Sequence, residues 1–103
     1  MIITLKDQLR ADLMTNFWAR NELETTTLRD VIKNIENQEK TGRVSTNFSD
    51  EEVRESLAAD AKLRRETAQE YFNKGNSERA TRETAEAIFI FQYLPARLND
   101  WAD

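Results

Sequence analysis

Five basic side chains on two stretches of the chain are of the right type to hold an anion. The first stretch carries Arg29 and Lys33, and the second carries Lys62, Arg64 and Arg65. On a helix, residues three or four positions apart share one face, so each stretch can present its charges together. Guanidinium groups bind phosphate oxygens through paired hydrogen bonds, which makes these five residues the candidates for an anion or RNA site.

The second stretch also fits a structural role. Asp60 precedes Arg64 by four residues, a spacing at which opposite charges pair along a helix, and Arg64 falls on the apolar stripe of its segment. The chain has 15 Lys and Arg against 19 Asp and Glu, a net charge of −4, which disfavours non-specific RNA binding. We therefore expect ion pairs inside the fold and keep tRNA contact as the alternative.

Several kinds of chemistry are excluded by composition. The chain contains no Cys and no His, so it cannot build a thiol nucleophile, a disulfide, a zinc site or a Ser-His-Asp triad. Two clusters of carboxylates remain as candidates for metal binding or acid–base chemistry. One contains Glu51, Glu52 and Glu55, and the other contains Glu83 and Glu86. Both are interpreted as charged helix surface. The sequence therefore predicts no catalytic residue, no metal site and no cofactor.

The pattern of apolar residues predicts four helices. Thr4 and Asp7 cap a first helix that reaches about Arg20, and Asn21 caps a second that ends in a polar loop over residues 41–47. Ser49 and Glu52 form a capping box. The third helix then continues over about residues 49–74.

A glycine and a proline bound the last part of the chain. Gly75 is a natural stop for the long helix, Asn76 and Ser77 begin a fourth, and Pro95 forbids its continuation. The predicted fold class is all-α, a single four-helix domain with one long helix.

Aromatic and aliphatic residues divide into two groups. Four aromatics at helical spacing are expected in the core or at its rim: Phe17, Trp18, Tyr71 and Phe72. The fourth helix has no polar face from residue 87 to 91, so either the first and third helices wrap it, or Phe89 and Ile90 form a contact surface flanked by Tyr93 and Trp101. The second alternative predicts a homodimer or a protein partner bound through the fourth helix.

The chain shows no targeting or membrane signal. Its N-terminus has no apolar run of signal-peptide length, and the longest apolar stretch is far shorter than the ~20 residues of a membrane span. A cytoplasmic protein that has no membrane contact is expected.

These motifs, taken in order, resemble the YqeY-like family, which is grouped with the tail of the B subunit of glutamine-dependent aminoacyl-tRNA amidotransferase. The matching pieces are Leu5-Lys6-Asp7-Gln8-Leu9, Asp12-Leu13, Thr27-Leu28-Arg29, Ile32-Lys33-Asn34, Ser49-Asp50-Glu51-Glu52-Val53, Lys62, Arg64-Arg65-Glu66, Glu70-Tyr71, Gly75, Tyr93-Leu94-Pro95 and Leu98.

The resemblance implies an all-helical N-terminal domain over residues 1–95, followed by a short tail over 96–103 where relatives continue into a second helical domain. It also implies an association with carbon–nitrogen ligation that uses glutamine as amide donor, and it carries over no catalytic residue. We therefore expect a one-domain accessory module of tRNA amidation. The alternative is a protein-interaction module, without amide chemistry, that binds itself or another protein through its fourth helix.

Overall fold

The structure is a computed structural model that describes residues 3–42 and 47–95. It contains four helices: α1 (Leu5–Trp18), α2 (Glu22–Thr41), α3 (Asp50–Asn73) and α4 (Ser77–Phe91). No strand occurs within the described ranges. The all-α class and the long third helix are confirmed. The chain groups into two compact units, Met1–Ser56 and Leu57–Asp103.

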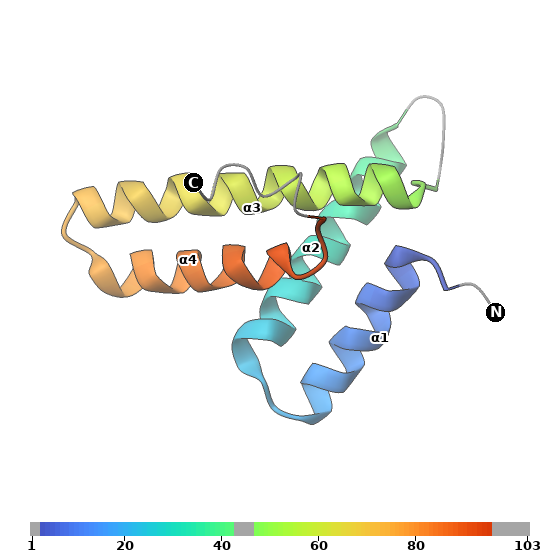
Figure 1. The fold of residues 1–103 in the computed structure, drawn as a ribbon, viewed down its shortest axis with the longest axis horizontal. Helices are drawn as coiled ribbons and strands as arrows, with labels where there is room; N and C mark the ends of the chain where they lie inside the picture. The colour runs from blue at the N-terminus through green and yellow to red at the C-terminus, as the bar shows by residue number, and fades with distance from the viewer. Residues whose placement is uncertain (1–2, 43–46, 96–103) are drawn as a thin grey trace. The chain divides into compact units, whose positions relative to one another are not determined.

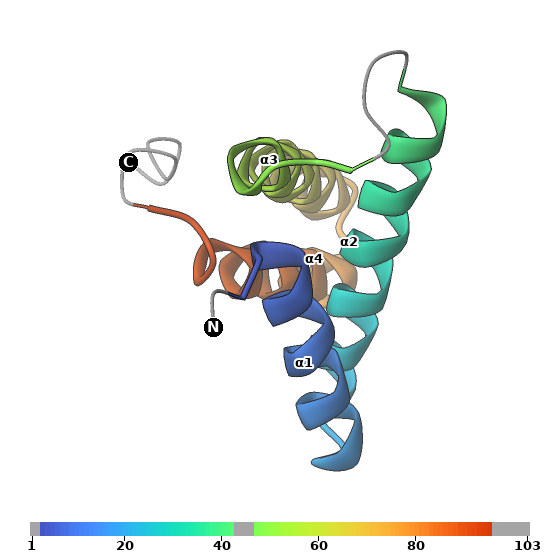
Figure 2. The same cartoon turned by 90° about the vertical axis from the view of Figure 1, so that its right-hand side faces the viewer.

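The first unit is built on a hairpin of α1 and α2, which pack against each other (Figures 1 and 2). Its buried side chains are large aliphatics at helical spacing, chiefly Leu9 from α1 and Leu28, Val31 and Ile35 from α2, each at most 2% exposed. Thr27 is also fully buried, and its hydroxyl donates to the carbonyl of Leu23 one turn earlier. This bond satisfies the Thr27 hydroxyl. Packing of the buried residues, and not helix propensity, holds the threonine-rich run helical.

The second unit pairs the part of α3 from Leu57 onward with α4, which returns alongside it (Figure 1). Alanines supply much of what is buried here, in contrast to the first unit. The buried apolar residues of the unit are Leu57, Ala61, Ala68, Ala80, Ala87, Ile90 and Leu94.

Both hairpins close with the same three-residue turn. After α1, the N–H of Asn21 donates to the carbonyl of Asn16, and the N–H of Arg20 donates to Phe17. After α3, the N–H of Asn76 donates to Tyr71 and that of Gly75 to Phe72. This is the Schellman arrangement, which needs a left-handed residue in its middle.

The left-handed position differs between the two turns. Gly75 occupies it with a φ of 82°, as the sequence predicted, whereas Arg20 occupies it with a φ of 62°. A side chain is disfavoured in this conformation because its Cβ approaches the following carbonyl. Arg20 therefore lies beyond the end of α1 at Trp18, a correction to the expected boundary.

The helix starts follow the predicted capping residues with one exception. The Thr4 hydroxyl accepts from the N–H of Asp7 at 3.1 Å, and Ser49 and Glu52 exchange reciprocal bonds of 3.2 and 3.0 Å. Asn21 precedes α2 but makes no side-chain cap bond. Its side-chain amide instead donates to the side-chain oxygen of Asn16, so Asn21 stabilises the turn and does not cap α2.

Candidate functional site

The candidate anion-binding residues lie in different parts of the chain. Arg29 and Lys33 are exposed on α2, one turn apart in the first unit. Lys62 and Arg65 are exposed on α3 in the second unit. The fifth, Arg64, is mostly buried.

Arg64 is held between two carboxylates. Its Nε lies 2.7 Å from Asp60 on the same helix, and one terminal nitrogen lies 3.1 Å from Glu86 on α4. The exposed fractions of the three side chains are 15%, 12% and 6%. Burial alone would lower the pKa of Arg64, but the two carboxylates outweigh burial and raise it. The predicted pairing of Asp60 with Arg64 is confirmed, and this guanidinium serves the fold.

The carboxylates of α4 depart from their interpretation as helix surface. Glu86 is buried at 5% exposed, and it pairs with Arg64 and, at 3.8 Å, with Arg82. Burial and the neighbouring charge of Glu86 raise the pKa of Glu83. The apolar pattern could not show this, because Glu86 is buried by virtue of its partner on α3. Within the described residues, no group of three acidic side chains could hold a metal ion.

The apolar end of the fourth helix is only partly exposed. Ile90 is 1% exposed, so its side chain already belongs to the core and is not available to a partner. Phe89 is half-buried and packs edge to face against Tyr93, with ring centroids 6.0 Å apart. Ile88, which faces another side of the helix, is 57% exposed. Trp101 lies outside the described residues.

The aromatic residues that the sequence assigned to the core or its rim are largely at the surface. Trp18 is 74% exposed, Phe72 is 65% exposed and Phe17 is 48% exposed. Phe17 and Trp18 lie edge to face at 5.3 Å at the end of α1, near Met14, which is 53% exposed. Helical spacing placed these residues on apolar stripes correctly. However, each apolar stripe continues beyond the part of the helix that other residues bury, so its last side chains are exposed.

Two shallow grooves flank the hairpin of α3 and α4. One, of about 440 Å³, is polar, and Arg79 lies in it with its guanidinium 5.6 Å from the ring centre of Tyr71. The other, of about 630 Å³, has Phe72 and Ile88 as its large apolar side chains. Its lining residues are Arg65, Ala68, Gln69, Phe72, Ser77, Ala80, Thr81, Thr84, Ala85 and Ile88, and we refer to it as the α3–α4 groove.

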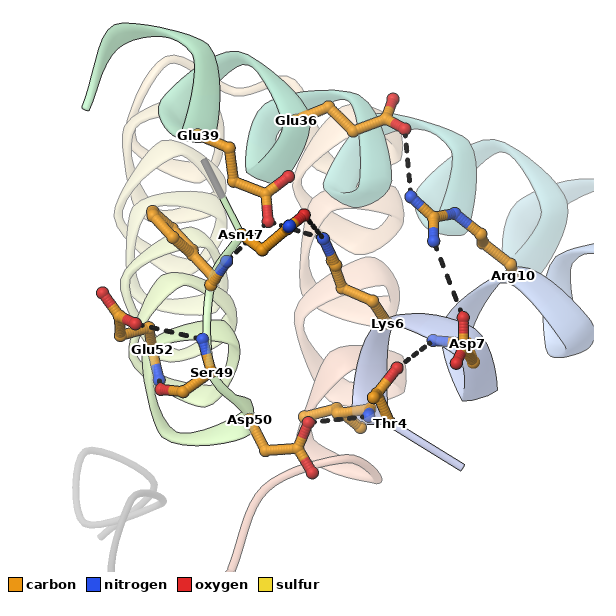
Figure 3. Close-up of polar contacts among 12 residues, drawn as sticks. Thr4, Lys6, Asp7, Arg10, Glu36, Glu39, Asn47, Ser49, Asp50 and Glu52 are labelled. Atoms are coloured by element: carbon orange, nitrogen blue, oxygen red, sulfur yellow. Dashed lines mark hydrogen bonds and ion pairs between the residues drawn. The ribbon is translucent and has the colours of Figure 1, made fainter. Parts of the chain in front are cut away.

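A buried carboxylate that sequence reasoning missed organises the first unit (Figure 3). Glu39, at the end of α2, accepts a 2.6 Å ion pair from Lys6 on α1 and a 2.7 Å bond from the backbone N–H of Phe48. Burial would raise the pKa of Glu39, but the bonds from Lys6 and Phe48 outweigh it and hold the pKa below its ordinary value. We call these contacts the Glu39 clasp.

A second bond joins the same segments beside the clasp. The first backbone N–H of α1, on Leu5, donates to the carboxylate of Asp50 at 2.9 Å (Figure 3). Asp50 thereby begins α3 and satisfies an N-terminal donor of α1, where a negative charge also favours the helix dipole. The clasp and this bond are occupied by the chain itself, so they hold the fold and leave no open chemistry.

The described helices also bear on the membrane question. None of them is both long enough and apolar enough to cross a lipid bilayer.

The chain has a clear match at the level of a protein family. The sequence profile of the YqeY-like proteins matches residues 6–101, which is nearly the whole chain. No match was found among the curated proteins.

Proposed function

This chain belongs to the YqeY-like family, and we propose that it is a non-catalytic accessory module of glutamine-dependent tRNA amidation that acts by binding a protein. Residues 1–95 form the module in this proposal, and its place of action is the cytoplasm. The amidation context comes from the family resemblance, and the mode of action comes from the surface of the molecule.

The observation that carries the proposal is the way charged and apolar side chains are used. The most buried charged groups, Glu39, Arg64 and Glu86, are engaged in pairs within the chain. Large apolar groups, by contrast, stand exposed, with Trp18 and Phe17 at the end of α1. Aromatic side chains that protrude in this way are the usual anchors of protein interfaces. These buried charged groups stabilise the fold, and the exposed aromatics are the candidates for recognition.

Charge near the α1 end favours a protein over RNA as the bound partner. The first turn of α2, which follows this end directly, contains Glu22 and Glu24. Two carboxylates in this position oppose the approach of a phosphate backbone, although Arg20 lies between them and the aromatics. A protein surface with an apolar pocket and a basic rim fits both features.

A binding and activity measurement on the purified chain tests the proposal. We expect fluorescence anisotropy to show binding of the labelled chain to a glutamine-dependent aminoacyl-tRNA amidotransferase, and the chain alone to release no ammonia from glutamine. Ammonia release well above blank that disappears on a single substitution would make the chain an enzyme and overturn the proposal.

A second candidate function is supported by the exposure of Ile88 and the partial exposure of Phe89. In this alternative the chain is a protein-interaction module that binds itself or another protein through α4, without any link to amide chemistry. Self-association combined with no binding to the amidotransferase would favour it over the first proposal.

A further inference from the structure

The α3–α4 groove has the composition of an interface. Of its ten lining residues only Arg65 is charged, in a chain in which 33% of residues are charged. Phe72 and Ile88 expose 65% and 57% of their surface, while the floor is formed by small side chains such as Ala68 and Ala80. Two large side chains beside a small-residue floor form two knobs and a shallow hole.

The pairing of the two helices fixes where the knobs stand. Arg64 bonds Glu86, and Arg79 bonds Tyr71 seven residues nearer the turn on both helices. The helices are therefore antiparallel and in regular register. Phe72 stands on α3 at the turn end of the groove, and Ile88 stands on α4 at the opposite end. The knobs occupy diagonal corners, and the other two corners are formed by Arg65 and by Ser77, while Ala68 and Thr81 lie nearer the middle of the groove.

A diagonal arrangement of this kind is complementary to itself. A twofold axis that crosses the helices lays the turn end of one groove on the far end of another. Phe72 then lies against Arg65 and Ala68 of the second copy, and Ile88 lies against the small side chains at its turn end.

The single charge of the groove agrees with the same arrangement. The rotation places Arg65 over the ring of Phe72 of the second copy, a favourable position for a guanidinium. It also keeps the two Arg65 side chains at opposite ends of the interface, so like charges do not meet.

We propose that a second copy of this chain occupies the α3–α4 groove, forming an antiparallel dimer in which Phe72 and Ile88 insert into the opposite corners of the partner groove. This inference rests on the second candidate function, self-binding through α4, and deepens it by naming the surface and the arrangement. It uses a different surface from the aromatic end of α1, so either of the two can fail alone.

Sedimentation of the full chain from about 1 µM to about 500 µM tests the dimer, a range suited to an interface of modest size. We expect a monomer–dimer equilibrium that Phe72→Ala weakens at least tenfold and that Ile88→Ala also weakens. Both residues are exposed, so neither change empties the core. Leu63→Ala is the matched control, because Leu63 is an apolar residue of α3 that is 63% exposed and lies outside the groove. It should leave the equilibrium unchanged.

Single cysteines test the orientation, since the chain has none of its own. Thr81 lies near the twofold axis of the antiparallel dimer, so Thr81→Cys should form a disulfide-linked dimer on oxidation, and Leu63→Cys should not. A monomer throughout the concentration range would overturn the proposal. So would association that Phe72→Ala leaves intact, assemblies larger than a dimer, or a groove occupied only by another protein.

Discussion

The two helical hairpins of the chain share a turn but are stabilised in different ways. In the first unit large aliphatic side chains fill the interior, and the Glu39 clasp joins α1, the end of α2 and the approach to α3. In the second unit four of the seven buried apolar residues are alanines, and Arg64 links the helices through Glu86. The clasp ties segments that are distant in sequence, whereas the Arg64 pairs bind one hairpin to itself.

The same turn therefore does not require the same interior. Small side chains allow two helices to lie side by side with little apolar burial. A buried ion pair then has a larger part in fixing the register of the two helices. The second hairpin also leaves Phe72 and Ile88 outside, since an alanine-rich interior has no room for them.

The largest effect is expected from removing the carboxylate of the clasp. Glu39→Ala leaves the N–H of Phe48 without its acceptor and leaves the Lys6 ammonium with its longer, 3.5 Å bond to Asn47. It should lower the free energy of unfolding by about 2 kcal/mol. Chemical denaturation measures this change. Glu36→Ala is the control, because the pair of Glu36 with Arg10 is about half exposed and should contribute less than about 0.5 kcal/mol. Equal losses in the two variants would show that the clasp has no special role.

A somewhat smaller loss is expected in the second unit. Arg64→Met removes one partner of Glu86 and of Asp60, but Glu86 keeps Arg82 and Asp60 is partly accessible to water. The free energy of unfolding should fall by about 1.5 kcal/mol. Lys62→Met on the exposed side of the same helix should change it little, and thermal unfolding of both variants makes the comparison. An Arg64 variant as stable as the Lys62 variant would show that the Arg64 ion pairs do not stabilise the second unit.

The two turns should respond in opposite directions to changes at their left-handed residue. Gly75→Ala should destabilise the chain by about 1 kcal/mol, and this cost is one of backbone conformation, because no atom lies within 4 Å of the added Cβ. Arg20→Gly should stabilise it by up to about 1 kcal/mol. Melting temperatures of the two variants and the wild-type chain measure both effects. If Arg20→Gly destabilises the chain, the Arg20 side chain makes a contribution that outweighs its strained backbone.

The smallest effects concern pH and have opposite signs in the two units. The pKa of Glu39 is lowered in the folded state, so its contribution to stability is present above the ordinary pKa of 4.5 and is lost as the pH falls through the folded value. The pKa of Glu83 is raised, so ionising it costs stability as the pH rises from 4.5 through the folded value.

Substitution by glutamine separates these two contributions. Glu39→Gln should flatten the loss of stability on the acid side, whereas Glu83→Gln should stabilise the chain slightly at neutral pH. Unfolding curves recorded between about pH 3 and 7 measure both. The same pH dependence in both variants would contradict the assignment.

Local signals explain what could be predicted from the sequence. The capping box of Ser49 and Glu52, the stop at Gly75 and the pair of Asp60 with Arg64 all join residues within one turn or at one backbone position, so their spacing suffices. For the same reason the four helices and the long α3 were predictable, because each has its own start and stop.

Contacts between distant residues were not predictable in this way. Lys6 and Glu39 are 33 positions apart, and neither has a local pattern that identifies it as buried. Exposure was equally hidden, because spacing puts Phe17 and Phe72 on apolar stripes but does not show where covering helices end. Ile88 and Ile90 are two positions apart, about half a helix turn. They therefore lie on opposite sides of α4, and Ile90 is buried while Ile88 is exposed.

The central proposal is that the chain acts by binding a protein, and one comparison tests it most directly. Anisotropy titrations of a glutamine-dependent aminoacyl-tRNA amidotransferase into labelled wild-type chain and into labelled Trp18→Ala should show binding that the substitution weakens at least tenfold, with folding unchanged because Trp18 is 74% exposed. No binding by the wild-type chain, or equal binding by both, would contradict the account.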